Sequence, residues 1–116
     1  MTTDSEFMAA TDHVLAAIGA ALDAALADSD VDLDWNLNDG ILEIECEDGS
    51  KLIVNRHVPN RELWVAARAG GFHFRADGRL WRDTRSGDDL AVVLAKLLRA
   101  QGGLTITLPT LVAPAE

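Results

Sequence analysis

The sequence predicts an α+β fold, a two-layer sandwich whose N- and C-terminal helices pack on one face of an antiparallel sheet of five to six strands. Apolar residues recur at helical spacing near both ends of the chain, and apolar and polar residues alternate with a period of two between them. Each predicted helix has one apolar stripe and the sheet has one apolar face, so both helices must cover that face. The other face of the sheet is therefore expected to lie in water.

The first helix is predicted over residues 4–27, where apolar residues recur at steps of three, four and seven. Thr3 followed by Glu6 fits a capping box at its start. The second helix is predicted to follow "RSGDD", with Ser86 as its N-cap and the two following aspartates in its first turn. Its buried stripe is expected to consist of Leu90, Val93, Leu94, Leu97 and Leu98. The glycines of "QGG" are expected to end it.

The strands are predicted from alternating residues and from the turn signals between them. The alternation begins with "VDLDWNL", and "NDG" and "EDGS" are typical hairpin turns. Strands are expected over residues 31–37, 42–47, 51–56, 62–68, 72–75 and 80–84. The final "LTITLPTLVAPAE" is expected to be a short strand or an apolar tail over the gap between the helices. A single domain is predicted over residues 1–116, with 109–116 as its C-terminal tail.

The charge of the chain is unevenly distributed. Residues 1–50 contain thirteen acidic residues and no lysine or arginine, whereas ten basic and six acidic residues follow. The acidic half is expected to attract cations or basic protein surfaces and to repel nucleic acid. No apolar run approaches a membrane span and the first residues are acidic, so a cytoplasmic protein is expected. One cysteine, Cys46, excludes an internal disulfide and leaves too few thiolates for a metal cluster.

A group of acids near the end of the first predicted helix is the candidate metal site. Asp28, Asp30, Asp32 and Asp34 occur at every second position. The acids after the helix are expected to project from one side of an edge-like strand, next to Asp23 and Asp28 at the helix end. Carboxylates on an open surface suit hard divalent cations at low affinity, with water completing the coordination shell. An EF-hand loop is excluded because its sixth position needs glycine, and that position is leucine here. Protection of an edge strand against aggregation explains the same charges and stays open as an alternative.

Trp64 is the candidate interaction residue. By strand parity it lies on the polar face of its strand with Glu62 and Arg68, next to Ile53 and Asn55 of the preceding strand. A tryptophan exposed beside an aliphatic residue is typical of an interface hot spot. The alternative is that strand twist returns Trp64 to the core. No nucleophile elbow, phosphate loop or His-rich metal motif is visible, so the protein is not expected to be an enzyme.

Several motifs, in order along the chain, resemble the frataxin family in its bacterial CyaY-type form. They include "DSEF", "DSDVDLD", "DGILEIECEDGSKLIVNR" and "GGFHF", and the resemblance covers residues 4–108. It implies a helix–sheet–helix sandwich and a non-enzymatic regulator of iron-sulfur cluster assembly. Such a protein binds Fe(II)/Fe(III) weakly and docks on the cysteine desulfurase and scaffold complex. A monomer is expected, with iron-induced oligomers left open.

The resemblance also assigns residues to the two surfaces. The iron-binding acids it implies are Asp23, Asp28, Asp30, Asp32 and Asp34, with Asp4, Glu6 and Asp12 as outlying acids. The sheet surface it implies falls on Asn55, Trp64 and His73. Strand parity adds Ile53, Glu62 and Arg68, and His57 is added as a neighbour of this surface, so the expected partner-binding residues are Ile53, Asn55, His57, Glu62, Trp64, Arg68 and His73.

This chain departs from the family pattern at three places, and one of them is the loop "NLNDG", which is longer than usual. The end of the first helix carries alanines where relatives have further acids, and His57 and Glu62 stand where many relatives have glutamine. The alanines imply a reduced iron capacity. The competing hypothesis is an acidic secretion-type chaperone that binds a protein partner without metal. Iron storage at a di-iron site is disfavoured, because the chain lacks paired Glu-x-x-His helical ligands.

Overall fold

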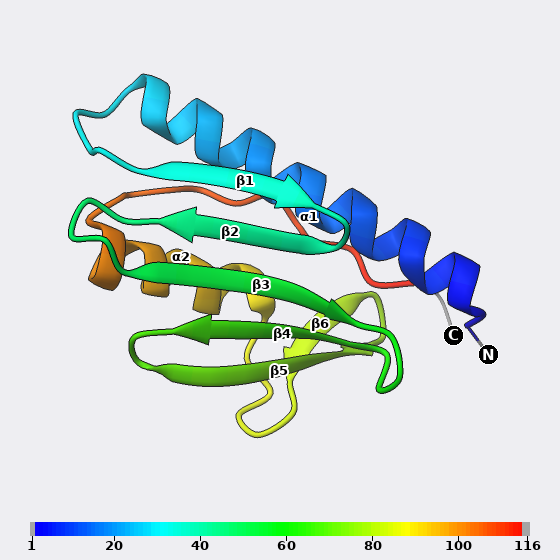
Figure 1. Cartoon of the computed structure of the whole chain (residues 1–116). Helices are drawn as coiled ribbons and strands as arrows, with labels where there is room; N and C mark the ends of the chain where they lie inside the picture. The colour runs from blue at the N-terminus through cyan, green and yellow to red at the C-terminus, as the bar shows by residue number, and fades with distance from the viewer. Residues whose placement is uncertain (1, 115–116) are drawn as a thin grey trace.

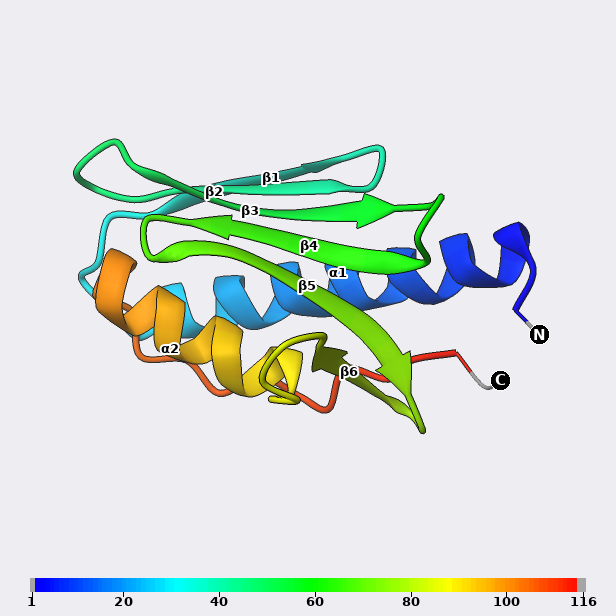
Figure 2. The same cartoon turned by 90° about the horizontal axis from the view of Figure 1, so that it is seen from below.

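The computed structural model describes residues 2–114 and contains two helices and six strands. In chain order they are α1 (Asp4–Ala27), β1 (Asp34–Asn38), β2 (Ile41–Glu45), β3 (Lys51–His57), β4 (Glu62–Ala67), β5 (Gly70–Asp77), β6 (Leu80–Asp83) and α2 (Leu90–Gly102). The strands form one antiparallel sheet in the order β1-β2-β3-β4-β5-β6. Both helices lie on the same side of this sheet (Figures 1 and 2), which confirms the predicted two-layer sandwich. The opposite side is called the outer face below.

Helix α1 begins and packs as its sequence predicts. The hydroxyl of Thr3 accepts the N–H of Glu6, and the carboxylate of Glu6 accepts the N–H of Thr3, which completes the capping box. Its buried residues are Phe7, Thr11, Val14, Leu15, Ile18, Gly19 and Leu22. By length and composition alone α1 is also apolar enough to cross a membrane, although aspartates interrupt its apolar residues. In this fold its apolar stripe packs against the sheet instead.

Gly19 provides the space for an aromatic side chain of the edge strand. A Cβ at this position would lie 2.6 Å from Cη2 of Trp35, closer than van der Waals contact permits. The indole of Trp35 packs against α1 there and donates its Nε1–H to Oδ1 of Asp23 at 2.8 Å. The glycine that weakens the helix therefore allows β1 to approach it.

We expect Gly19→Ala to lower the free energy of unfolding by about 1 kcal/mol. Alanine favours a helix interior over glycine by about 1 kcal/mol, but overpacking costs about 1–3 kcal/mol, and Trp35 must move to admit the methyl group. Chemical denaturation measures the difference. In a Trp35→Ala background the same change should instead stabilise the protein. Stabilisation in both backgrounds would show that Trp35 does not limit the space at Gly19.

The sheet is organised by tight hairpins, and its first strand is shorter than predicted. Asp39 and Gly40 form a two-residue turn with φ of 48° and 78°, the left-handed pair that matches the twist of a hairpin. Strand β1 begins at Asp34, so residues 31–33 precede the sheet. Leu33 is nevertheless buried, because it packs under the sheet beside Gly102 of α2. The alternation of apolar residues thus predicts correctly which side chains are buried, but it begins before the first hydrogen-bonded residue of the strand.

The N-cap of α2 is Asp89, and the prediction of Ser86 is wrong. Asp89 has an extended backbone, and its carboxylate accepts the N–H of Ala91. The hydroxyl of Ser86 instead accepts the N–H of Asp88 within the preceding turn. Both aspartates therefore precede the first helical turn. The predicted end is confirmed, since Gly103 caps α2 in the left-handed conformation with φ of 67°.

The segment after α2 runs between the two helices beneath the sheet (Figure 1). Leu104, Leu111 and Ala113 are buried there, and Val112 forms an isolated bridge with Leu80 of β6. The segment therefore covers the gap between the helices as predicted, as an extended tail and not as a further strand of the sheet.

Candidate functional site

Four of the predicted metal-binding acids lie together where the chain leaves α1 and enters the sheet. Asp28 is the C-cap of α1, Asp30 and Asp32 lie in the connection, and Asp34 is the first residue of β1. These four residues are called the acidic end below. All are exposed, and among the described residues their carboxylates have no hydrogen-bond or ion-pair partner. The prediction that the acids after α1 project from one strand is wrong, because only Asp34 belongs to β1.

The other four predicted acids are engaged by neighbouring side chains. Asp23 accepts the indole N–H of Trp35. The remaining pairs are Asp12 with Arg56 at 2.6 Å, Asp4 with Arg61, and Glu6 with Thr3. Backbone and side-chain hydrogen bonds from Thr3 hold the pKa of Glu6 below its ordinary value. A cation at any of these acids must compete with an existing contact.

The ion pair of Asp12 with Arg56 was not predicted from the sequence. The side chain of Arg56 is only 7% exposed and lies on the inner side of the sheet, beside Gly40. Its parity with Leu52 and Val54 signals this position. Asp12 is therefore the nearer counter-charge of a nearly buried guanidinium, whose second partner, Asp39, lies at 3.8 Å, and the removal of Asp12 would leave that cation poorly compensated.

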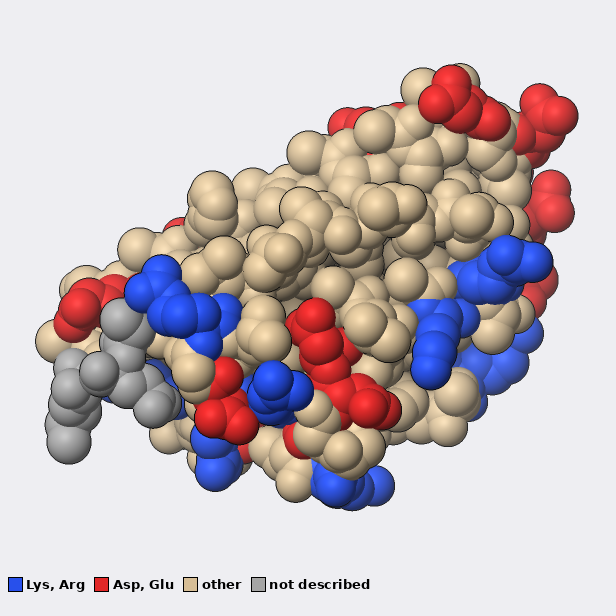
Figure 3. Space-filling model, turned by 180° about the vertical axis from the view of Figure 1, so that it is seen from behind, with Lys and Arg blue, Asp and Glu red and all other residues tan. Residues whose placement is uncertain are grey.

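The acidic end does not form a chelating cluster. Within residues 2–114 no three His, Cys, Asp or Glu residues lie close enough to hold a metal ion between them. Seen from the helical side, acidic side chains gather where α1 ends, beside a broad uncharged area (Figure 3). A cation there would retain most of its water, which corresponds to weak, outer-surface binding.

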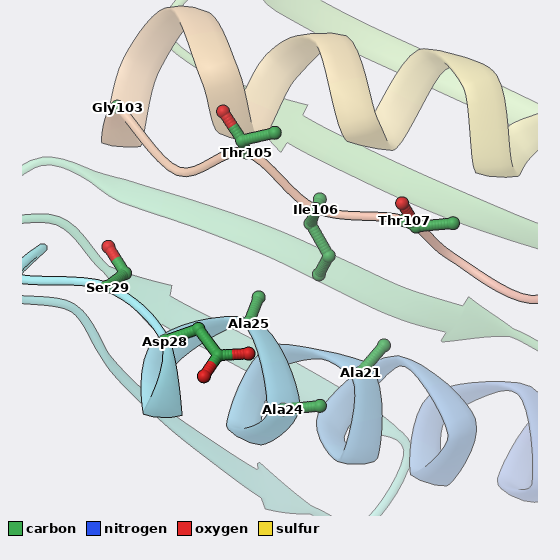
Figure 4. A pocket seen from close by; sticks show the side chains of 9 residues that line it. All are labelled: Ala21, Ala24, Ala25, Asp28, Ser29, Gly103, Thr105, Ile106 and Thr107. Carbon is green, nitrogen blue, oxygen red and sulfur yellow. The ribbon is translucent and has the colours of Figure 1, made fainter.

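A groove of about 440 Å³ lies beside the acidic end, where α1 carries alanines in place of the acids of its relatives. It is bordered by α1 and by the segment after α2 (Figure 4). On the α1 side its lining consists of Ala21, Ala24 and Ala25, and Asp28 is the one charged residue among the described lining residues. The thin acidic face of α1 that the sequence predicts is thus a groove with a single carboxylate.

Trp64 lies on the outer face, as strand parity predicts. Its neighbours Leu63 and Val65 are buried in the core, whereas Trp64 is not part of it. It pairs with Asn55 of β3 and with His73 of β5. Both faces of the indole are covered, by His57 at 3.7 Å and by His73 at 4.4 Å between ring centroids. The tryptophan is therefore half-buried and held in place, not freely exposed.

Glu62 was predicted as an exposed contact residue, and this prediction is wrong. It is only 3% exposed, because Trp64, His73 and Arg75 surround its carboxylate. Nε1 of Trp64 donates to Oε1 at 2.8 Å, and Nη2 of Arg75 donates to Oε2 at 2.6 Å. Burial by itself raises the pKa of Glu62. The hydrogen bonds from Trp64 and Arg75, with the charges of Arg75 and His73, outweigh burial and lower that pKa.

We expect the carboxylate of Glu62 to become protonated only at a pH below the ordinary pKa of glutamate. Because the pKa of Glu62 is lowered on folding, the ionised carboxylate contributes fully to the stability of the protein above a pH of about 4.3, the ordinary glutamate pKa. This contribution is lost as the pH falls through the lowered pKa. An NMR titration of the Glu62 carboxyl carbon measures this directly. A midpoint above the ordinary value would mean that burial outweighs the bonds from Trp64 and Arg75.

The other predicted contact residues divide between two places. Ile53 and Asn55 are half-buried on the outer face near Trp64, Ile53 opposite Ala66. Arg68 lies beyond the end of β4 and pairs with Asp48 in the turn between β2 and β3. Hydrogen bonds from Ser50, together with Arg68, lower the pKa of Asp48 to about 2. Arg68 therefore belongs to this turn and not to the surface around Trp64.

Comparison with known proteins places this geometry in a family. The model of the Frataxin-like domain matches residues 1–104. An iron-sulfur cluster assembly protein CyaY from Dechloromonas aromatica is 54% identical over 106 residues, 90% of this chain and 97% of that protein. The protein of the same name from Cupriavidus metallidurans is 47% identical over 106 residues, 91% of this chain and 96% of that protein. The chain belongs to the frataxin family.

Solved frataxin structures have the same architecture. Frataxin from Psychromonas ingrahamii superimposes with a TM-score of 0.75 at 30% identity, over 92% of this chain and 97% of that one. Yeast frataxin, at 23% identity, gives a TM-score of 0.61 over 82% of this chain and 76% of that one, which supports the fold alone. The resemblance to bacterial CyaY-type frataxins seen in the sequence is confirmed.

Proposed function

We propose that this frataxin is an accessory and regulator of iron-sulfur cluster assembly, a single non-enzymatic domain that acts in the cytoplasm. Membership of the frataxin family carries the proposal, since relatives that align with nine-tenths of the chain are named as cluster assembly proteins. It also favours this function over an acidic secretion-type chaperone.

The acidic end is the proposed iron site. Its four exposed carboxylates have no protein partner among the described residues and sit at the edge of the molecule, so a cation binds there without breaking a contact. Fe(II) or Fe(III) would be held weakly, by single carboxylates and water. Asp4, Glu6, Asp12 and Asp23 would contribute through long-range attraction, because each has a partner already. The alanine-lined groove beside Asp28 supports a low iron capacity.

The outer face around Trp64 is the proposed docking surface for the cysteine desulfurase and scaffold complex. It combines a large aromatic residue with Ile53 and Asn55, the composition of an interface hot spot. The net charge of −9 disfavours nucleic acid and anionic membranes as partners. The free protein is proposed to be a monomer.

Co-purification from a bacterial extract tests the proposed partner. A tagged chain is expected to recover a cysteine desulfurase, identified by its mass and its bound cofactor, and to lose it when Trp64 is changed to alanine. Recovery of a secreted effector in place of the desulfurase would support the chaperone hypothesis and reject this one.

A further inference from the structure

Three aromatic rings form a continuous stack on the outer face. His57 and Trp64 are nearly parallel, with an interplanar angle of 10°, and Trp64 and His73 meet at 8°. His73 is directly opposite Trp64 on the neighbouring strand, and His57 is its diagonal neighbour on the other side. Cross-strand neighbours at these positions are within reach of aromatic rings. The two histidines therefore prevent the indole from rotating about χ1.

Glu62 restricts the orientation of the same indole through a hydrogen bond to its N–H. Its carboxylate binds the indole N–H at 2.8 Å and is itself anchored by Arg75 at 2.6 Å. Glu62 lies two residues before Trp64 on the same face of β4, so the bond spans one strand repeat. Because Glu62 is nearly buried, this bond is shielded from competing water. The indole is held on both faces and at its polar edge.

We propose that His57, Glu62 and His73 are positioning residues that hold Trp64 in one orientation before docking. This inference rests on the proposed docking function and adds a property of the surface. With both faces covered and its N–H already bonded, Trp64 presents only its apolar edge to a partner. The partner therefore contacts a flat, rigid surface. It needs neither a pocket that encloses the indole nor a hydrogen-bond acceptor for the indole N–H.

The surroundings of the stack indicate the chemistry of the partner surface. Ile41, which is 44% exposed, adjoins Asn55 and continues the row through Trp64 on the apolar side. On the other side Arg75 and Arg82 are register partners on β5 and β6. Their side chains are 62% and 42% exposed, and their guanidiniums pair with Glu62 and Asp77. A flat protein surface with an apolar centre and an acidic margin fits this arrangement.

Paired variants separate stacking and orientation from other roles. His57→Ala removes the stack, whereas His57→Phe preserves it, and Nδ1 of His57 has no hydrogen-bond partner among the described residues that phenylalanine would lose. Glu62→Ala removes the acceptor for Trp64, whereas Glu62→Gln keeps an oxygen in the same place. Two readouts apply to each variant: the NMR signal of the Trp64 indole N–H in the free protein, and the affinity for a bacterial cysteine desulfurase–scaffold complex by calorimetry.

Both alanine variants are expected to broaden or shift the Trp64 indole signal and to weaken docking about three- to tenfold. The loss arises because the side chain of Trp64 must then be ordered on binding, which costs conformational entropy. His57→Phe and Glu62→Gln should stay within about twofold of the wild type. Equal affinity of the wild type and all four variants overturns the inference alone. An equal loss in His57→Phe and His57→Ala also overturns it, since a nitrogen contact would then matter. If the wild type itself does not bind, the proposed docking function fails as well.

Discussion

Changing Asp28, Asp30 and Asp32 together to asparagine is expected to weaken Fe(II) binding by more than about tenfold. A divalent cation 4 Å from one carboxylate in water gains about 2 kcal/mol, twice the value for two unit charges. The three acids are exposed and have no protein partner among the described residues, so asparagine removes charge without removing a structural contact. Anaerobic calorimetry with Fe(II) measures the effect, and circular dichroism verifies that the fold is retained.

Asp12→Asn is the matched control for this triple variant. Asp12 is also an acid of the first half of the chain, but it is paired with the nearly buried Arg56. Its replacement should lower the free energy of unfolding and leave the Fe(II) isotherm nearly unchanged. An unchanged isotherm in the triple variant, or an equal loss of binding in Asp12→Asn, would reject the acidic end as the iron site.

Changing Trp64 to alanine is expected to weaken docking on the desulfurase–scaffold complex by about 2 kcal/mol or more, the effect of a hot-spot aromatic. Trp64 occupies the centre of the outer face between Asn55 and His73, so its loss removes the largest apolar contact available there. The fold should persist, because the residue lies outside the hydrophobic core. Affinity by calorimetry and stability by thermal denaturation are measured on the same sample.

Leu63→Ala provides the contrast for Trp64→Ala. Leu63 is the preceding residue of β4 and is completely buried, so its truncation should cost about 2–5 kcal/mol of stability and affect docking only through the folded fraction. A large loss of stability in Trp64→Ala with unchanged docking would show that Trp64 serves the fold and not the interface.

Strand parity predicted the two faces of the sheet because a period of two depends only on local geometry. It placed Trp64 on the outer face beside Ile53 and Asn55, as the structure has them. It could not predict the burial of Glu62, which results from Arg75 and His73 of β5. Parity assigns a side chain to a face but does not show what covers it there.

The acids illustrate the same limit. Their positions in the sequence predicted an acidic region, but not which carboxylates are free. Asp23 is engaged by Trp35 and Asp12 by Arg56, both contacts between α1 and the sheet.

The N-cap of α2 was predicted wrongly for a local reason. Ser86 and Asp89 are both residue types that suit an N-cap, and the bridge of Asp89 with Arg82 of β6 favours the later position.

An NMR titration, first with Fe(II) and then with the cysteine desulfurase–scaffold complex, tests the central claim that iron and protein partner use separate surfaces. Fe(II) is paramagnetic and should broaden the signals of residues 28–34 while the indole signal of Trp64 stays sharp. The complex should then shift the signals of Ile53, Asn55, Trp64 and His73. Broadening centred on the outer face, or on the paired acids Asp4 and Asp12, would contradict the account.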